Sequence, residues 1–315
     1  GQTFSLKPMN CPESTFIYRS KVRSYRDLPL RYAEYGRLHR NERSGTLSGL
    51  TRVRAFVQDD AHIYVRPDQL ADELADLFAM TTEAYSWFGF VPRYTFATKP
   101  AKAIGDPRLW EQAEGLIREA LERAGVPFRI KPGDGTFYAP KIDLYIDDAL
   151  GREWQMATFQ IDLVMLPERF DLTYVDEHGA QVRPVAIHRA LYGSLERFIG
   201  VLLEHTAGAL PMWCAPLQAV IVPIADRHVE PARELAAVLR ARGLRVEVDA
   251  SDDRMQAKIR AAQGQKVPYM LVLGDREVEA RTAAPRTRAG EQQTPEAWEA
   301  LADRLAAESA ARHPD

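Results

Sequence analysis

Residues 51–65 alternate between two kinds of side chain, which predicts a strand with one apolar and one polar face. Successive side chains of a strand point to opposite faces, so the polar face carries every second residue. These residues are Arg52, Arg54, Phe56, Gln58, Asp60, His62 and Tyr64. The opposite face, from Val53 to Val65, has Asp59 as its one polar residue. Such a strand is either the floor of a binding site or a strand with a solvated face, and the alternation alone does not decide between them.

The preceding segment, residues 28–40, predicts a partner strand, because residues 44–49 contain two Ser-Gly pairs that are typical of turns. A hairpin of this kind would present Arg40 and Arg52 to the same ligand. Two guanidinium groups directed at one point suit a phosphate, which accepts paired hydrogen bonds from arginine.

Apolar residues recur at helical spacing in residues 67–87 and 107–124, which predicts two amphipathic helices. Strands are predicted at residues 136–146 and 154–165, and a further helix at residues 194–205. The buried stripe expected on that last helix consists of Leu195, Phe198, Ile199, Leu202 and Leu203.

After residue 216, strands and helices alternate along the chain. Strands are predicted at residues 217–224, 244–248 and 267–273, and helices at residues 227–242, 254–263 and 295–309. Alternation of this kind is typical of a small, largely parallel α/β domain. We therefore expect two domains, residues 1–212 and 213–315, which is also the number that a chain of 315 residues suggests.

The composition narrows the class of protein. A net charge of −3 gives no overall attraction to nucleic acid, so any RNA contact must come from a local basic surface. No segment has the long uncharged apolar run of a membrane helix, and no secretory signal pattern opens the chain. The two cysteines, Cys11 and Cys214, are a poor disulfide framework and indicate a reducing cytoplasm. Since the chain begins without methionine, we expect it to be a piece of a longer protein.

Four sequence blocks, in this order along the chain, resemble motifs of the threonine-specific class II aminoacyl-tRNA synthetases. They are Lys-Pro-Met-Asn-Cys-Pro at residues 7–12, His-Arg-Asn-Glu-Arg-Ser-Gly with Thr-Arg-Val-Arg-Ala-Phe-Val-Gln-Asp-Asp-Ala-His at residues 39–62, Phe-Tyr-Ala-Pro-Lys-Ile-Asp at residues 137–143, and Ile-His-Arg-Ala leading into Gly-Ser-Leu-Glu-Arg-Phe at residues 187–198. The second block resembles motif 2 of that class, and the fourth resembles motif 3. The resemblance extends through the C-terminal region. It implies an α+β catalytic domain, an antiparallel sheet with flanking helices, followed by a smaller α/β anticodon-binding domain.

The resemblance implies a threonine–tRNA ligase, which activates threonine with ATP and transfers it to tRNA(Thr). Adenylate formation needs positive charge directed at the phosphates more than it needs a nucleophilic side chain. By resemblance, Arg40 holds the α-phosphate and the amino acid carboxylate, Arg52 supports the phosphates, and Arg197 holds the γ-phosphate. Further ATP-site candidates are Glu42 at the adenine amino group, Gln155, Ser194 and Lys141, with Glu153 as a candidate ligand of Mg²⁺. Outside this motif context, such arginines are normally surface ion-pair residues.

Cys11, His62 and His188 are scattered along the chain and form no local zinc signature, so each would be structural by default. The resemblance instead implies that all three bind one zinc ion. Three protein ligands leave one coordination position open, as in catalytic zinc sites. Such a metal rejects valine, which offers no side-chain oxygen, more strongly than an apolar pocket could.

The resemblance further implies that zinc takes the amino and hydroxyl groups of threonine, with Asp60 accepting from the hydroxyl and Tyr138 near the amino group. Gln58 and Gln160 are further substrate-binding candidates. Serine keeps the hydroxyl and lacks only a methyl group, a difference of about 1–3 kcal/mol, so the site should misactivate serine. The family corrects this error in a separate editing domain, which we expect to lie outside this chain.

In the C-terminal region, the resemblance implies contacts to anticodon bases through Glu277 and Arg286, with Arg260 in support and Lys258 on a phosphate. An arginine reads a guanine edge through two hydrogen bonds, and a glutamate accepts from a base amino group. Motif 1, which builds the dimer interface in this class, should precede Lys7. We therefore expect a homodimer of the full-length protein.

Two other interpretations stay open at this point. A synthetase paralogue could bind RNA as a regulator without charging tRNA, although the arginines of both motifs and all three metal ligands are retained. A generic metal-dependent hydrolase is disfavoured, because the chain has no clustered His/Asp metal motif. The chain departs from the resembled pattern at Glu13, Ser14 and Ser48, changes that could alter the handling of the tRNA acceptor end.

Overall fold

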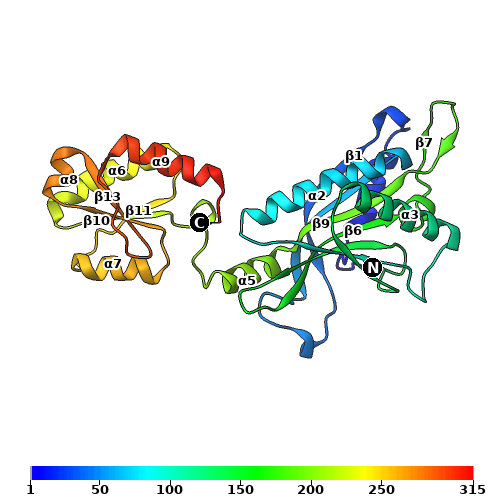
Figure 1. Cartoon of the computed structure of the whole chain (residues 1–315), viewed down its shortest axis with the longest axis horizontal. Coiled ribbons are helices and arrows are strands. Elements are labelled where there is room, and N and C mark those ends of the chain that lie inside the picture. Colours follow the sequence, from blue (N-terminus) through cyan, green and yellow to red (C-terminus); the bar gives the residue numbers. More distant parts are fainter. Residues whose placement is uncertain (1, 315) are drawn as a thin grey trace. The chain divides into compact units, whose positions relative to one another are not determined.

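The computed structural model describes residues 2–314, which divide into two compact units (Figure 1). The first unit comprises Gly1–Tyr85 and Phe90–Val201, and the second comprises Ser86–Gly89 and Leu202–Asp315. The domain boundary expected at residue 212 stays a prediction. No helix of residues 2–314 combines the length and the apolar character needed to cross a membrane.

A seven-stranded sheet forms the centre of the first unit. In spatial order its strands are β1 (Leu30–His39), β2 (Ala55–Val65), β9 (Val185–Ser194), β6 (Glu153–Asp162), β5 (Lys141–Asp147), β3 (Arg93–Ala97) and β4 (Phe128–Lys131). Neighbouring strands run antiparallel, except that β3 and β4 are parallel. The predicted hairpin is confirmed, because β1 pairs with β2 along its whole length.

The central strand β9 brings the second and fourth sequence blocks into register. His188 lies opposite His62 on β2 and opposite Gln160 on β6. Asp60 lies opposite Ala190 on the same strand. Directly opposite residues of adjacent strands present their side chains on the same face of a sheet. The polar face predicted for β2 therefore continues across three strands.

Helices α2 (Leu70–Ser86) and α3 (Pro107–Arg123) confirm the two predicted amphipathic helices. α3 begins where Asp106 accepts a hydrogen bond from the backbone of Arg108, with Pro107 in the first turn. Phe78 of α2 packs edge-on against Phe159 of β6, with ring centroids 5.9 Å apart. Burial of this apolar face against the sheet explains why both helices form.

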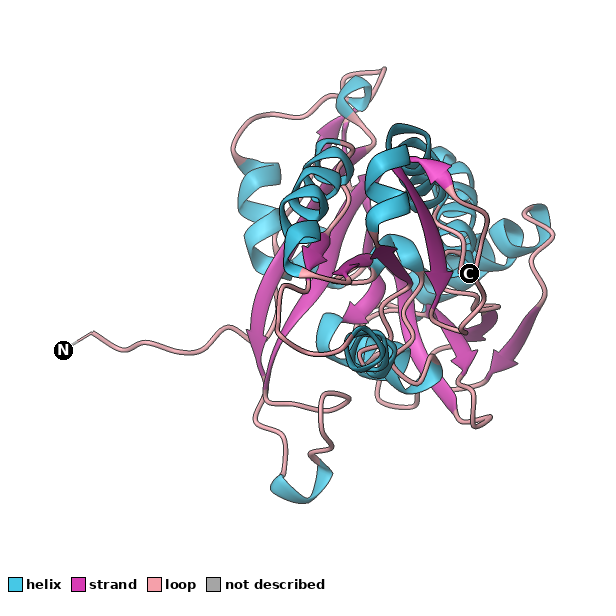
Figure 2. Ribbon diagram, turned by 90° about the vertical axis from the view of Figure 1, so that its left-hand side faces the viewer, coloured by secondary structure: helices cyan, strands magenta, loops and turns pink. Residues whose placement is uncertain are grey.

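Shorter elements complete the first unit. They are α1 (Cys11–Arg19), α4 (Met165–Arg169), α5 (Leu195–His205), the hairpin of β7 (Tyr174–Val175) and β8 (Gln181–Val182), and 3-10 turns at Tyr25–Asp27, Ser44–Thr46 and Pro67–Gln69. Residues 2–10, which precede α1, form no helix or strand (Figure 2).

Three predicted strand boundaries are wrong. Residues 51–54 form a turn before β2, because Arg52 bonds back to Ser48. Residues 136–140 form a second turn before β5, closed between Thr136 and Ala139. β6 ends at Asp162, whose carboxylate accepts the backbone N–H groups at the start of α4.

The buried stripe predicted for α5 is partly wrong. Phe198 and Leu202 are buried as expected, but Ile199 is 49% exposed and Leu203 is 39% exposed. Val201, at 1% exposure, takes their place. The face that packs inward follows the positions 198, 201 and 202, because Phe198 packs on Tyr192 with ring centroids 4.5 Å apart.

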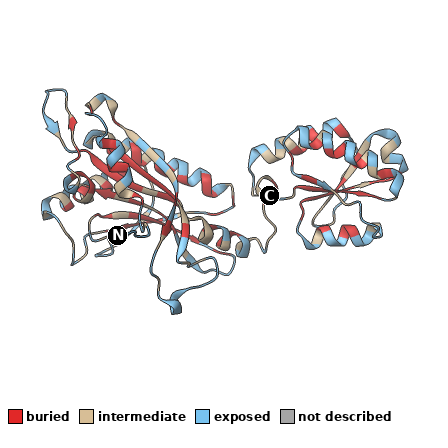
Figure 3. Ribbon diagram, turned by 180° about the vertical axis from the view of Figure 1, so that it is seen from behind, coloured by how far each residue is buried: buried red, intermediate tan, exposed pale blue. Residues whose placement is uncertain are grey.

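The second unit is built on a five-stranded sheet. In spatial order its strands are β11 (Val246–Val248), β10 (Ala219–Pro223), β12 (Tyr269–Leu273), β13 (Thr282–Thr287) and β14 (Glu296–Ala297). Its helices are α6 (Val229–Ala241), α7 (Met255–Gly264), α8 (Asp275–Ala280) and α9 (Trp298–Ala311), with 3-10 turns at Met212–Cys214 and Asp226–His228. The first three strands are parallel as predicted, whereas β13 and β14 add an antiparallel edge that the sequence pattern did not predict. Figure 3 shows that the buried residues concentrate in the strands and on the inner faces of the helices.

Candidate functional site

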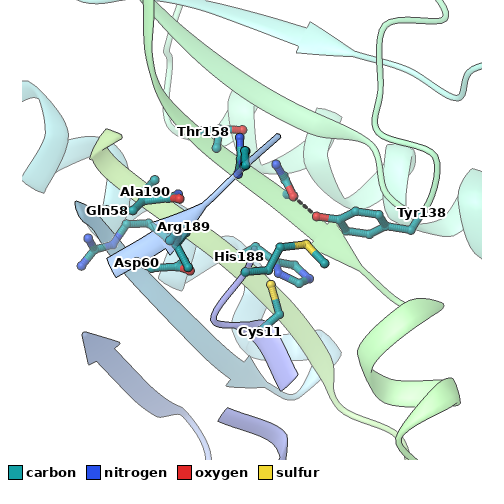
Figure 4. Close-up of a pocket in the computed structure, with 12 residues that line it drawn as sticks. Cys11, Gln58, Asp60, Tyr138, Thr158, His188, Arg189 and Ala190 are labelled. Carbon is teal, nitrogen blue, oxygen red and sulfur yellow. Dashed lines mark hydrogen bonds between the residues drawn. The ribbon is translucent and has the colours of Figure 1, made fainter. Parts of the chain in front are cut away.

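Cys11, His62 and His188 come together in the first unit, although they are far apart in sequence. Cys11 stands at the start of α1, His62 on β2 and His188 on β9. Their sulfur and nitrogen ligand atoms all lie within 4.8 Å of one another. Figure 4 shows the sulfur of Cys11 directed at the His188 ring. The three residues therefore have the spacing of a metal-binding group.

Two nitrogens of this cluster have no protein partner, and a bound metal ion would provide one. Nε2 of His62 and Nδ1 of His188 are buried and have no hydrogen-bond partner within residues 2–314. Buried polar atoms in proteins are nearly always paired, so two unpaired nitrogens facing one point indicate a ligand between them. One thiolate and two imidazoles are a donor set that zinc prefers. The residues present thus fit the zinc ion that the resemblance implies.

The electrostatics of the cluster favour a cation. Burial and the neighbouring His188 lower the pKa of His62 to about 2, so this imidazole is neutral, as a metal ligand must be. Burial alone would lower the pKa of His188, but Asp162 and the sulfur of Cys11 raise it to about 10. The Asp162 carboxylate and the Cys11 sulfur, which raise the pKa of His188, provide negative potential that would also favour a bound metal cation.

A pocket beside the cluster gathers the four substrate-binding candidates, Gln58, Asp60, Tyr138 and Gln160 (Figure 4). The Tyr138 hydroxyl donates to the side-chain oxygen of Gln160, and its ring lies 5.3 Å from that of His188. These residues come from β2, β6 and the turn before β5. The structure therefore brings residues of the second and third sequence blocks together with Gln160 of β6.

Asp60 is buried in this pocket and is held by Asn10. The side-chain amide of Asn10 donates to Asp60 over 3.1 Å. Burial raises the pKa of Asp60 to about 6, and the bond from Asn10 opposes that rise. A side chain at Gly36 would collide with the Asn10 amide, so the glycine on β1 makes room for this contact. Sequence reasoning missed Asn10, although it stands in the first block beside Cys11.

An adjoining pocket contains six of the ATP-site candidates. Its lining includes Arg40, Glu42, Arg52, Gln155, Ser194 and Arg197. Arg40, Gln58 and Gln160 line both pockets, so the two are continuous. Phe56 and Met156 also line this second pocket, and sequence reasoning gave them no role. The signal for Phe56 was its place on the polar face of β2.

Three guanidinium groups converge on this second pocket. Arg52 pairs with Glu42 at 3.1 Å, and Arg40 lies 5.0 Å from the centre of the Phe56 ring. Nε of Arg197 donates to the backbone oxygen of Thr51 over 2.8 Å. Burial and the like charges of Arg52 and Arg40 lower the pKa of Arg197. An anion placed among these groups would relieve their repulsion.

Asp59 shapes the loop that leads into this pocket, a role that the sequence did not reveal. Its carboxylate accepts the backbone N–H groups of three consecutive residues, Leu191, Tyr192 and Gly193, over 2.9–3.0 Å. The next residue, Ser194, accepts from the backbone of Arg197. Asp59 thus fixes the end of β9 and the start of α5.

Two weaker candidates do not face the phosphate pocket. Glu153 is exposed, pairs with Arg93 at 2.9 Å and lines a different pocket of the first unit, and its role as a Mg²⁺ ligand stays a prediction. Lys141 pairs with the buried Asp143 at 2.6 Å, which gives it a structural partner. Of the departures from the resembled pattern, Ser14 is buried and hydrogen-bonds the Tyr64 hydroxyl over 2.7 Å.

The anticodon candidates lie in the second unit. Arg286 is on β13 and half-buried, and its Nε has no hydrogen-bond partner within residues 2–314. Arg260 is exposed on α7, and Glu277 accepts from the backbone of Gly274 over 2.9 Å at the start of α8. Lys258 is buried and donates to the backbone oxygen of Asp249, and its phosphate contact stays a prediction.

Comparison with known families assigns both parts of the chain. Residues 1–206 match the family described as tRNA synthetase class II core domain (G, H, P, S and T). Residues 218–308 match the family described as anticodon binding domain. The expected fold class, an α+β class II core followed by a smaller α/β anticodon-binding domain, is confirmed.

The individual relatives described next are both named threonine–tRNA ligase. The threonine–tRNA ligase of Anaeromyxobacter dehalogenans (strain 2CP-C) is 53% identical over 309 residues, which are 98% of this chain and 47% of that protein. The threonine–tRNA ligase of Thermotoga neapolitana is 50% identical over 291 residues, 92% of this chain and 45% of that protein. The chain therefore spans about half the length of the curated relatives it matches.

A solved structure is also similar to this chain over most of the length of both chains. The crystal structure titled as the RNA binding domain of threonyl-tRNA synthetase from Cryptosporidium parvum Iowa II is 40% identical, with a TM-score of 0.89. The match covers 96% of this chain and 76% of that one. Sequence blocks, fold and site geometry agree with these comparisons, and the chain belongs to the threonyl-tRNA synthetase family of the class II aminoacyl-tRNA synthetases.

Proposed function

We propose that the full protein to which this chain belongs is a threonine–tRNA ligase that forms threonyl-adenylate from threonine and ATP and transfers the threonyl group to tRNA(Thr). The observation that carries the proposal is the continuity of two pockets. One is lined by Cys11 and His188 of the metal-binding group, and the other contains the three converging arginines. A small amino acid and a nucleoside triphosphate bound in them would meet beside Arg40, which lines both.

The proposed chemistry joins a carboxylate to a phosphate. A carboxylate oxygen of threonine attacks the α-phosphorus of ATP, the bond to the bridging oxygen breaks, and pyrophosphate leaves with the electron pair. Arg40 lies where it can neutralise charge on the α-phosphate and the carboxylate, and Arg52 and Arg197 bind the leaving phosphates. Mg²⁺ would neutralise the remaining charge of the triphosphate. Gln155 and Ser194 line the same pocket as polar groups that orient the nucleotide.

The amino acid pocket supports selection of a hydroxylated side chain. Cys11, His62 and His188 would hold zinc, which would supply a Lewis-acidic position that only an oxygen donor can complete. Asp60 lies beside this position as a hydrogen-bond acceptor for a hydroxyl, and Asn10 fixes its orientation. Tyr138 and Gln160 form the opposite wall. A valine side chain has no hydroxyl to donate to Asp60, so this carboxylate would gain no hydrogen bond from it, which disfavours its binding.

The second unit would read the tRNA. Arg286 offers a half-buried guanidinium on β13, a group that can donate two hydrogen bonds to a base edge. The alternative of a non-charging, RNA-binding relative is less well supported, because it gives no reason for three arginines to share a pocket at the cost of mutual repulsion.

The test is threonine-dependent exchange of labelled pyrophosphate into ATP by the full-length protein. We expect exchange with threonine, weaker exchange with serine and essentially none with valine. Exchange that prefers another amino acid would contradict threonine as the substrate. Tight binding of tRNA without any exchange would instead favour the RNA-binding alternative.

A further inference from the structure

Asp162 is a completely buried carboxylate next to the metal-binding group, and the family motifs do not include it. It is the last residue of β6, and the neighbouring strand β9 carries His188. One carboxylate oxygen lies 3.0 Å from Nε2 of His188. The other accepts the backbone N–H groups of Val164 and Met165, over 2.9 and 2.6 Å.

Asp162 can act only as a hydrogen-bond acceptor toward His188. An ionised carboxylate has no hydrogen to donate, so the shared hydrogen must be on Nε2 of the imidazole. A metal ligand must be a neutral imidazole, and a neutral imidazole with its hydrogen on Nε2 has its lone pair on Nδ1. Nδ1 is the buried nitrogen of His188 that has no hydrogen-bond partner within residues 2–314, and His188 belongs to the cluster with Cys11 and His62.

The backbone contacts of Asp162 make this orientation rigid. Together its two oxygens accept three consecutive N–H groups, those of Val164, Met165 and Leu166, where α4 begins. A carboxylate held by so many fixed donors cannot rotate away from His188 without breaking them. The start of α4 and the metal-binding group are therefore joined through one side chain.

We propose that Asp162 is a positioning residue that fixes His188 as an Nδ1 metal ligand. The inference rests on the proposed zinc site and adds a residue outside the three ligands. Hydrogen-bonded partners of this kind orient a ligand and increase its basicity, and their loss typically weakens metal binding by about 10–100-fold.

The first experiment compares the zinc affinity of the wild type with that of Asp162→Ser, by competition with a chromophoric chelator. Serine can still accept a hydrogen bond at a helix start but is too short to reach His188. We expect its zinc affinity to fall by about 10–100-fold. The matched control is Asp148→Ser, because Asp148 is another buried carboxylate, which accepts from the backbone of Leu150 and Arg152 and from the Trp154 ring. The control should lose stability on thermal unfolding and keep the zinc affinity of the wild type.

The outcomes separate this inference from the proposed function. If the wild type binds no zinc, the proposed zinc site fails and the inference fails with it. If the wild type and the folded D162S variant bind zinc equally, only the inference is overturned. A crystal structure of the zinc-loaded wild type decides the question even if D162S does not fold. Zinc on Nδ1 of His188, with Nε2 bonded to Asp162, supports the inference, and zinc on Nε2 overturns it.

Discussion

Arg197 is held by the protein in a position where its charge is costly. Its Nε is bonded to the backbone of Thr51, and burial with the nearby Arg52 and Arg40 lowers its pKa. A group whose charged form is destabilised by like charges gains more from a bound anion than an isolated surface arginine does. This environment distinguishes Arg197 from the surface ion-pair residue that it would be by default.

Replacing Arg197 with alanine should reduce kcat/KM for ATP in pyrophosphate exchange by about 10²–10³-fold, the usual loss when one preorganised donor to a developing charge is removed. The KM for threonine should change little, because Arg197 lines the second pocket and not the first. Arg108→Ala is the control, since Arg108 forms an exposed pair with Asp106 on α3. Equal kinetics for R197A and the wild type would remove Arg197 from the ATP site.

The sequence motifs pointed to the candidate ligand-contacting residues, but they did not point to the residues that position those side chains. Cys11, His62 and His188 converge as the resemblance implied, because the family pattern encodes a geometry that sequence distance hides. Asn10 and Asp162 could not be found in this way. Each acts through a contact with a residue far along the chain, and such a contact becomes visible only when the strands are paired.

Elements with one clear apolar face were predicted well, and those without such a face were missed. α2 and α3 each bury one side against the sheet, so their periodicity is visible. In β2 the alternation of residue types is visible although both faces are buried over most of its length. β9 was missed because it is a central strand, buried along most of its length, in which alternation fades. α1 was missed because its buried residues are Ser14, Thr15 and Tyr18, which form no apolar stripe.

The end of β9 provides a prediction at the scale of the element. Gly193 has a φ of +72°, and a Cβ there would lie 2.6 Å from the backbone oxygen of Met156 on β6. Gly193→Ala should therefore lower the free energy of unfolding by about 1–3 kcal/mol, measured in urea. Exchange activity should fall as well, because Gly193 lines the ATP pocket.

Gly115→Ala is the matched control for G193A. Gly115 lies within α3, and a Cβ there would meet no heavy atom within 4 Å. Alanine is the better helix residue, so this variant should gain about 0.5–1 kcal/mol in the free energy of unfolding. If both variants lost stability equally, the close approach between β9 and β6 would not be the cause.

The molecule as a whole separates two recognition tasks between its two units. The candidate residues for the amino acid and ATP all lie in the first unit, and those for the anticodon all lie in the second. A change in the second unit that removes one base contact should therefore leave adenylate formation intact.

Arg286→Ala in the full-length protein should raise the KM for tRNA(Thr) in aminoacylation by about 10–100-fold, the effect of losing one base contact of about 1–3 kcal/mol. Pyrophosphate exchange, which needs no tRNA, should keep its wild-type rate. Arg242→Ala, which removes an exposed pair with Asp303 in the same unit, should change neither assay. If R286A impaired both assays, the separation of tasks would be wrong.

The positions of the three metal ligands also make zinc binding dependent on folding. They come from α1, β2 and β9, so an unfolded chain would have to close very long loops to gather them. Zinc would then bind almost only to the native protein and, at a free concentration of one hundred times its Kd, would stabilise it by about 2.7 kcal/mol. Scarcity of the metal would reach beyond catalysis, because molecules without zinc would open more often and be degraded sooner.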